Sequence, residues 1–191
     1  MNGRSCWTLV LAAACAASIC IPFPSAAQDH RNAIRSGAGL YATVGDANDL
    51  ADNGLAWFGS YERFFSEKLG LEFMLAYVDY DSVLDLLGGL SMIPVTATLN
   101  YHLQGEGVDL FVGPTLGFAR LESSGSGGLF DVFEESWEET EFAWGGAVAI
   151  DVPFGEARKW VVSGSARYLT AAFERTDFGN FIIQLGAGYR F

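Results

Sequence analysis

The stretch NFIIQLGAGYRF, residues 180–191, decides the fold of this chain. Its residues alternate between two kinds along its whole length. One parity is apolar or aromatic throughout: Phe181, Ile183, Leu185, Ala187, Tyr189 and Phe191. The other parity is mainly small, polar or charged: Asn180, Ile182, Gln184, Gly186, Gly188 and Arg190. Because successive side chains of a strand point to opposite faces, the stretch predicts a β-strand with one wholly apolar face.

The same period of two recurs in earlier segments, at 36–45, 55–64, 69–80, 92–103, 108–121, 141–152 and 159–170. Segments of this length can cross a bilayer as tilted strands. Short links lie at 66–68, 104–107 and 153–158, and mostly longer, acidic links lie at 46–54, 81–91, 122–139 and 172–178. Short turns at one end and longer loops at the other are typical of outer-membrane barrels. We therefore predict an all-β chain, an eight-stranded antiparallel transmembrane β-barrel with up-and-down meander order.

A soluble sandwich would also alternate, but the distribution of side chains favours a membrane barrel. Charged residues share the parity opposite to the apolar one, so the apolar face points outward. Aromatic residues cap the apolar parity near both ends of the strands, as expected at two membrane–water interfaces. They are Tyr61, Tyr101, Trp160, Tyr189 and Phe191 at the short turns, and Tyr77, Phe118, Phe142, Trp144, Tyr168 and Phe181 at the loops. The exceptions are Arg120, which has outward parity, and Pro94 and Pro114, which predict bulges or strand rims.

The N-terminal segment predicts a signal peptide over residues 1–27. Arg4 precedes the uncharged, mostly apolar run Cys6–Ile21, and small residues follow that run. The small residues of the predicted cleavage site are Ser25 and Ala27. Cleavage before Gln28 would leave 28–191 as the barrel, exported through the inner membrane to the outer membrane of a Gram-negative bacterium. The alternatives are a retained membrane anchor and a lipoprotein acylated at Cys15 or Cys20.

Two stretches carry a resemblance to known proteins. GAGYRF at 186–191 resembles the terminal signal of outer-membrane proteins. That resemblance implies that Tyr189 and Phe191 are read by the outer-membrane assembly machinery. MIPVTATLNYHL at 92–103, followed by VDLFVGPTLGFARL at 108–121, is similar to the OmpW family. This second resemblance implies passage of small hydrophobic compounds across the outer membrane. A generic small barrel resembling OmpA or the Opa-like adhesins is the alternative.

The inward residues, placed by depth, differ between the two halves of the predicted lumen. The periplasmic half holds a polar plug of Glu62, Glu72, Asn100, Asp109, Asp151 and Arg190, with Arg167 near the boundary. The outer half is mostly apolar and holds Phe58, Val78, Tyr80, Thr96, Ala119, Ala143, Leu169 and Ile182. A charged plug below an apolar cup would block water and ions yet accept a small hydrophobic molecule, which would leave sideways into the lipid. The alternative is that both halves are simply packed core.

Other classes of function are disfavoured. The formal net charge of −12 argues against nucleic acid as a partner. We expect no enzyme activity, because His30 lies in the N-terminal tail and His102 lies at the periplasmic end of its strand with no nearby serine. His102 is interpreted as a polar rim residue, with a lumen switch or ligand contact as the alternative. We expect no cofactor, and outer-membrane lipid and lipopolysaccharide as partners.

The acidic links carry a second hypothesis, that of a structural or adhesive barrel. Acidic and amide side chains crowd the first and third long links: Asp46, Asn48, Asp49, Asp52, Glu134, Glu135, Glu138 and Glu139. Their spacing matches no dedicated calcium loop, so we expect solvated loops and no metal site, with calcium or lipopolysaccharide bridging as the alternative. The third link also holds apolar side chains that suggest an interaction patch or a cover for the barrel mouth: Leu129, Phe130, Val132, Phe133 and Trp137.

Overall fold

The computed structural model describes residues 31–44, 51–82, 89–105, 107–124, 137–155, 157–172 and 177–191. The predicted signal peptide, its cleavage site and His30 therefore lie outside the described residues, as does most of the first and third long links. Within the described ranges, no helix has the length and apolar character needed to cross a membrane.

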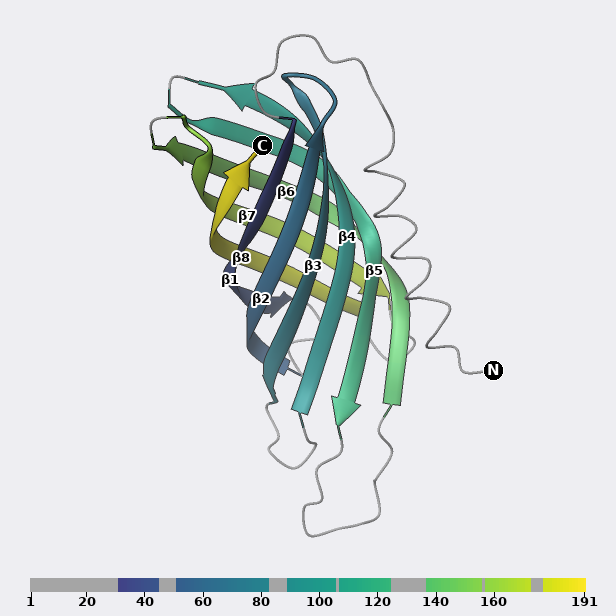
Figure 1. Cartoon of the computed structure of the whole chain (residues 1–191). Coiled ribbons are helices and arrows are strands. Elements are labelled where there is room, and N and C mark those ends of the chain that lie inside the picture. Colours follow the sequence, from purple (N-terminus) through teal and green to yellow (C-terminus); the bar gives the residue numbers. More distant parts are fainter. Residues whose placement is uncertain are drawn as a thin grey trace, which may run out of the picture.

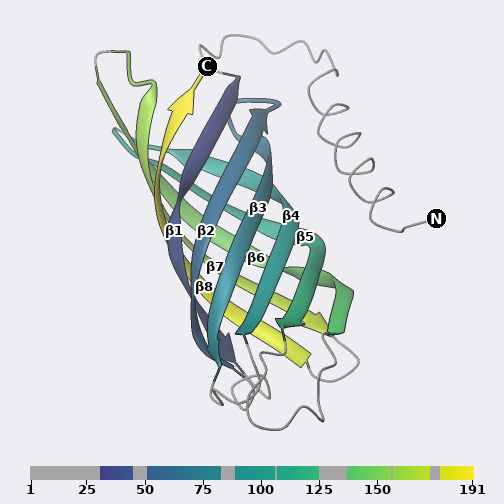
Figure 2. The same cartoon turned by 60° about the horizontal axis from the view of Figure 1, so that its bottom comes forward.

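Eight strands form a single closed sheet (Figures 1 and 2). They are β1 (Asn32–Val44), β2 (Ala51–Phe64), β3 (Leu69–Ser82), β4 (Gly89–Gln104), β5 (Asp109–Ser124), β6 (Trp137–Phe154), β7 (Trp160–Ala172) and β8 (Asp177–Arg190). Each strand pairs antiparallel with the next, and β8 pairs antiparallel with β1 to close the wall. The predicted fold class, an eight-stranded antiparallel barrel in meander order, is confirmed.

Several strands are longer than the alternation predicts. The first begins at Asn32, where the sequence predicts a start at 36, so it includes Arg35. The prediction was wrong here because Ile34 is the only large apolar residue among the first five, which hides the alternation. At the other end of the barrel, Asp52 lies in β2, and Trp137, Glu138 and Glu139 lie in β6. These four residues were predicted to lie in loops. Pairing with β5 keeps the three residues of β6 in the wall, whereas Asp52 lies at an irregularity in the pairing of β2 with β3, between Ala51 and Gly54.

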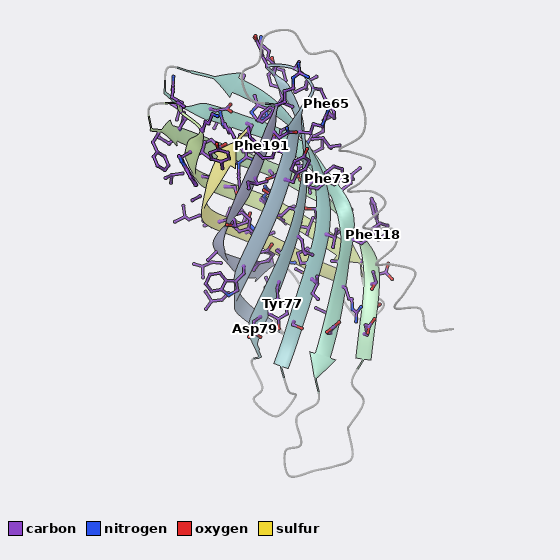
Figure 3. All side chains as sticks on the ribbon, in the orientation of Figure 1. Phe65, Phe73, Tyr77, Asp79, Phe118 and Phe191 are labelled. Atoms are coloured by element: carbon purple, nitrogen blue, oxygen red, sulfur yellow. The ribbon has the colours of Figure 1, made fainter. Side chains whose placement is uncertain are left out.

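The side chains of the apolar parity form the outer surface of the barrel. Trp57 and Leu185 are 70% and 69% exposed, and the other outward aliphatic side chains follow the same pattern. Aromatic rings gather at both ends, as predicted. Near the short turns Trp160 contacts Tyr189 edge-on, with ring centroids 5.0 Å apart. Figure 3 shows Phe65 and Phe191 toward this end and Tyr77 and Asp79 toward the other.

The two prolines interrupt the hydrogen-bonded ladders on either side of β4. Pairing of β3 with β4 runs to Leu75–Val95 and resumes in the same register at Val78–Met92. It therefore lapses where Ala76 and Tyr77 face Ile93 and Pro94, and we call this place the Pro94 seam. Pairing of β4 with β5 lapses in the same way where Leu99 and Asn100 face Gly113 and Pro114. Proline has no N–H to donate, which accounts for both lapses. The register is unchanged across each lapse and both prolines lie inside their strands, so the predicted bulges or strand rims are not found.

Glycine lets two strands approach closely where β8 closes on β1. Gly37 lies opposite Gly186 in the register of these strands. A Cβ atom added to Gly37 would collide with the backbone carbonyl of Leu185, and one added to Gly186 would meet the carbonyl of Ser36. Only residues without a side chain fit at this crossing.

Candidate functional site

The lumen near the short turns is filled by charged side chains. The predicted residues Glu62, Glu72, Asn100, Asp109, Asp151 and Arg167 all point inward and are at most 5% exposed. Arg190 also takes part, with its side chain 14% exposed. The alternation explains this placement, because each residue has the parity opposite to the lipid-facing side chains of its own strand. We call these residues, together with Arg35 and His102, the plug.

Arg35 of β1 lies at the centre of the plug, although the sequence-based strand did not include it. Its Nη2 donates to Glu62 Oε2 at 2.7 Å and to Asp151 Oδ2 at 2.8 Å. Its Nη1 lies 3.8 Å from Glu72 Oε1, and its guanidinium lies 5.1 Å from the centre of the Phe111 ring. One cation thus joins acids from three strands. The signal that could have found Arg35 is its inward parity, shared with Tyr41 and Thr43.

Two further arginines complete the ion pairs. Arg190 Nη2 lies 2.8 Å from both Asp109 Oδ2 and Asp151 Oδ2. Arg167 Nη2 donates to Glu72 Oε2 at 2.5 Å, and its Nη1 donates to Thr98 Oγ1 at 3.3 Å. The partners in these pairs lie 39 to 95 residues apart in the chain. Only closure of the barrel brings them together.

His102 belongs to the plug, so its interpretation as a polar rim residue is wrong. It is 1% exposed. Its Nε2 lies 2.9 Å from Glu62 Oε1, and its Nδ1 lies 3.1 Å from Asp109 Oδ1. The rings of Phe64 and Phe111 each lie 4.9 Å from the imidazole and cover it. Sequence position near a strand end suggested exposure, but these two aromatic side chains point inward at the same level.

The outer half of the lumen holds a contiguous apolar cluster. Its members are Tyr41, Ala56, Val78, Met92, Ala119, Leu121, Ala143, Leu169, Ala171 and Ile182. None of them is more than 4% exposed, so in this conformation the side chains fill the apolar half, where the sequence suggested an open cup. Of the other predicted lining residues, Thr96 is buried but polar, Phe58 is partly exposed and outside the cluster, and the Tyr80 side chain is outside the described residues.

Tyr41 is the polar exception inside the apolar cluster. The residue is 0% exposed, and its hydroxyl has no hydrogen-bond partner within the described part of the chain. A buried hydroxyl without a partner costs free energy, because it has given up its hydrogen bonds to water. The apolar cluster therefore contains one hydrogen-bonding group that is available to a molecule placed beside it.

Polar side chains separate the plug from the apolar cluster. Thr98 Oγ1 and Thr115 Oγ1 share a hydrogen bond of 2.9 Å across β4 and β5. Gln184 Nε2 donates to the sulfur of Met74 at 3.7 Å, and Ser165 Oγ donates to Gln184 Oε1 at 3.0 Å. The lumen thus changes from charged to neutral polar to apolar along the barrel axis.

Arg120, the outward cation, is paired on the outer wall. Its Nη2 lies 2.5 Å from Glu122 Oε1 and 2.6 Å from Glu138 Oε2, and its side chain is 35% exposed. Glu138, predicted as a loop acid, is therefore used in an ion pair between β5 and β6. Surface pairs of this kind contribute roughly 0–1 kcal/mol, so we assign this one a positioning role at the loop end of the wall.

Comparisons with known proteins agree with this geometry. A search of curated proteins finds no match. Among solved structures, the chain is similar to Ail, the attachment invasion locus protein of Yersinia pestis, at 19% identity and a TM-score of 0.59, covering 86% of this chain and 100% of Ail. It is similar to Neisserial surface protein A at 14% identity and a TM-score of 0.59, covering 83% and 95%. It is similar to OprG from Pseudomonas aeruginosa at 14% identity and a TM-score of 0.58, covering 85% and 96%.

Likeness at these identities shows the fold alone, whereas the family is shown by sequence. Residues 11–191 match the model of the family described as the outer membrane protein beta-barrel domain. The predicted resemblance to the small eight-stranded OmpW-like barrels is consistent with this match. With its closed eight-stranded wall, its lipid-facing apolar surface and its charged lumen, the chain belongs to the outer membrane protein beta-barrel family of the Gram-negative outer membrane.

Proposed function

We propose that the barrel passes small hydrophobic molecules from the cell exterior into the outer membrane, through the apolar half of the lumen and sideways through the wall. The observation that carries the proposal is the position of the Pro94 seam. The ladder resumes at the pair Val78–Met92, and both side chains belong to the apolar cluster. The wall is therefore missing ladder pairs beside the apolar half, where a lateral exit would be needed.

The plug determines the direction of exit. Its charged side chains fill the lumen at the short-turn end and are bound to one another. An apolar molecule entering this level would have to separate buried ion pairs, and doing so costs several kcal/mol per unpaired charge. Passage through the wall at the Pro94 seam, where two ladder pairs are missing, costs less, because no buried charge is separated from its partner.

The apolar cluster must rearrange to admit a ligand, and its composition allows this. Four of its ten members are alanines, and Met92 lies directly beside the seam. A methionine side chain has three rotatable bonds and adapts to irregular spaces, so Met92 can move without disturbing the backbone. The unpartnered Tyr41 hydroxyl favours ligands with one hydrogen-bonding group, such as medium-chain esters or alcohols.

The test compares the two prolines. We expect Pro94→Ala, which restores a backbone N–H at the seam, to slow the entry of a medium-chain ester into cells severalfold. Pro114→Ala is the matched control, because it makes the same chemical change at the interruption beside Asn100, at the level of the plug. Equal entry in the wild type, both variants and cells without the protein would exclude lateral passage.

A second candidate function is a structural or adhesive barrel, and the tight packing of the apolar cluster favours it. One solved neighbour of the same fold, Ail, is an attachment invasion locus protein. The acidic links of this chain would then meet host molecules or stabilise lipopolysaccharide through divalent cations. Shortening 125–136 should abolish adhesion or weaken the envelope, while Pro94→Ala leaves both unchanged.

We also infer that the barrel is not an enzyme and needs no cofactor. The one histidine in the described part of the chain, His102, has carboxylates on both ring nitrogens. We further infer export with cleavage before Gln28, and recognition of Tyr189 and Phe191 by the assembly machinery. N-terminal sequencing of protein purified from outer membranes should begin at Gln28, and deletion of Phe191 should lower the amount assembled.

A further inference from the structure

His102 lies between two acids in the plug, and each ring nitrogen faces one of them. Nε2 lies 2.9 Å from Glu62 Oε1. Nδ1 lies 3.1 Å from Asp109 Oδ1 and 3.2 Å from Asp109 Oδ2. All three distances are in the hydrogen-bonding range, so each ring nitrogen needs a hydrogen between itself and the acid that it faces.

The two contacts together determine the protonation state of the ring. A neutral imidazole carries a single N–H and presents a lone pair on its other nitrogen, whereas an ionised carboxylate can only accept. A neutral ring would therefore place two lone pairs against each other at one of the two contacts. Only an imidazolium donates to both Glu62 and Asp109 at once.

The acids themselves are poor alternatives for the extra proton. Glu62 also accepts from Arg35 Nη2 at 2.7 Å and from Asn100 Nδ2 at 2.7 Å. Asp109 also accepts from Arg190 Nη2 at 2.8 Å. Carboxylates that already receive hydrogen bonds from cations are stabilised in the ionised form.

The charges of the plug give an independent argument. Four acids face the lumen at this level, from β2, β3, β5 and β6: Glu62, Glu72, Asp109 and Asp151. Three arginines face them, from β1, β7 and β8: Arg35, Arg167 and Arg190. The plug is neutral only if His102 of β4 supplies the fourth positive charge. A buried charge that no opposite charge compensates is strongly destabilising, because water does not solvate it.

We propose that His102 is a proton-binding site which, as an imidazolium, supplies the fourth cation of the plug and keeps the lumen closed to ions. Release of this proton leaves four acids facing three arginines and removes one of the two hydrogen bonds to the ring. The plug then gains a net negative charge that is relieved by entry of water and cations. This role concerns the closure of the charged half and does not depend on whether the apolar half passes ligands.

The proton is measured directly by nuclear magnetic resonance of the protein, labelled with 15N at histidine, in lipid nanodiscs at pH 7. An imidazolium shows two ring nitrogens with similar shifts, and a neutral ring shows two widely separated ones. We expect the imidazolium pattern for His102, assigned by its disappearance in His102→Gln, with His30 as the internal reference. A neutral pattern for His102 would overturn the proposal.

The closing role is measured by ion conductance across planar lipid bilayers. His102→Gln should raise conductance roughly tenfold or more, because one buried acid is left unbalanced. The double variant His102→Gln with Asp109→Asn restores three acids against three arginines, so conductance should return toward the wild-type value. A purely steric role of the imidazole predicts no such rescue. Wild-type conductance in the single variant, or no recovery in the double variant, would reject charge balance as the cause of closure.

Discussion

At the scale of single residues, Arg35 is the cation with the most acidic partners in the described part of the lumen. Its guanidinium contacts Glu62 and Asp151 directly and approaches Glu72, while its side chain is 2% exposed. Buried ion pairs offer little net stability over an apolar core. Removing one partner, however, leaves the other charges buried without compensation, which is strongly destabilising. The large effects of substitution in this barrel should therefore fall on the plug and not on its exposed charges.

Replacing Arg35 with methionine should lower the free energy of unfolding by about 3–5 kcal/mol, because Glu62 and Asp151 would remain buried with fewer cations. The measurement is urea unfolding in phospholipid vesicles, followed by tryptophan fluorescence. Lys68→Met, at an exposed turn residue, is the control and should change stability by less than about 0.5 kcal/mol. Equal effects of the two substitutions on the free energy of unfolding would show that the buried ion pairs of Arg35 contribute no more to stability than an exposed charge does.

Two tyrosines should respond in opposite directions to loss of the hydroxyl. The Tyr41 hydroxyl is buried without a partner, so Tyr41→Phe should leave stability unchanged or raise it by about 1 kcal/mol. The Tyr61 hydroxyl donates to Asn32 Oδ1 at 2.8 Å, so Tyr61→Phe should lower stability by about 0.5–1.5 kcal/mol. The same unfolding experiment decides both signs, and a marked loss on Tyr41→Phe would show that its hydroxyl has a partner.

At the scale of elements, β4 differs from the other strands because a proline interrupts its ladder on each side. The interruption with β3 lies beside the apolar cluster, and the one with β5 lies beside the plug. By contrast, β7 and β8 pair without a break from Trp160–Tyr189 to Ala172–Asp177. Local openings of the wall should therefore concentrate at the Pro94 seam.

Amide hydrogen exchange should detect this difference. Alternate residues of β3 direct their N–H groups to β2 and to β4, so either Ala76 or Tyr77 has its N–H at the seam. That amide should exchange faster than those of Tyr168 and Phe181, which lie in the unbroken pairing of β7 with β8. In Pro94→Ala the difference should shrink. Uniform protection across both places would show that the ladder closes in solution.

At the scale of the whole molecule, the even strand count places both ends of the barrel wall at the same end of the barrel. The N-terminal and C-terminal ends of the barrel meet, because the Arg31 N–H donates to the Phe191 carbonyl at 3.0 Å. The three short turns lie at this same end, and the strand ends that the long links join lie at the other (Figure 1). If the short turns face the periplasm, as in other barrels of this kind, the long links face the cell exterior.

Single cysteines should report this orientation on intact cells. The native cysteines lie at 6, 15 and 20, within the predicted signal peptide, so the processed barrel should give no background. A membrane-impermeant maleimide should label Ser126→Cys, in the third long link, and should leave Ala157→Cys, in the turn between β6 and β7, unlabelled. Permeabilised cells should label both. Labelling of Ala157→Cys alone on intact cells would reverse the orientation.

The sequence by itself determined the fold and the direction of most side chains. Alternation with a period of two is a property of each strand alone, so it could be recognised at 180–191 without knowing any partner strand. It placed Glu62, Asp109 and Asp151 inside the barrel correctly. It failed at the start of β1, where Ile34 is the only large apolar residue beside Arg35 and the other neighbours are small or polar, so the alternation is hidden.

Only the tertiary structure decided which inward residues meet and how deeply they are buried. Arg35 and Asp151 lie 116 residues apart and contact each other because β8 closes on β1. His102 lies near a strand end yet is buried, because Phe64 and Phe111 come from two other strands to cover it. Contacts across a lumen depend on register and closure, which are properties of all the strands together, whereas alternation is a property of one.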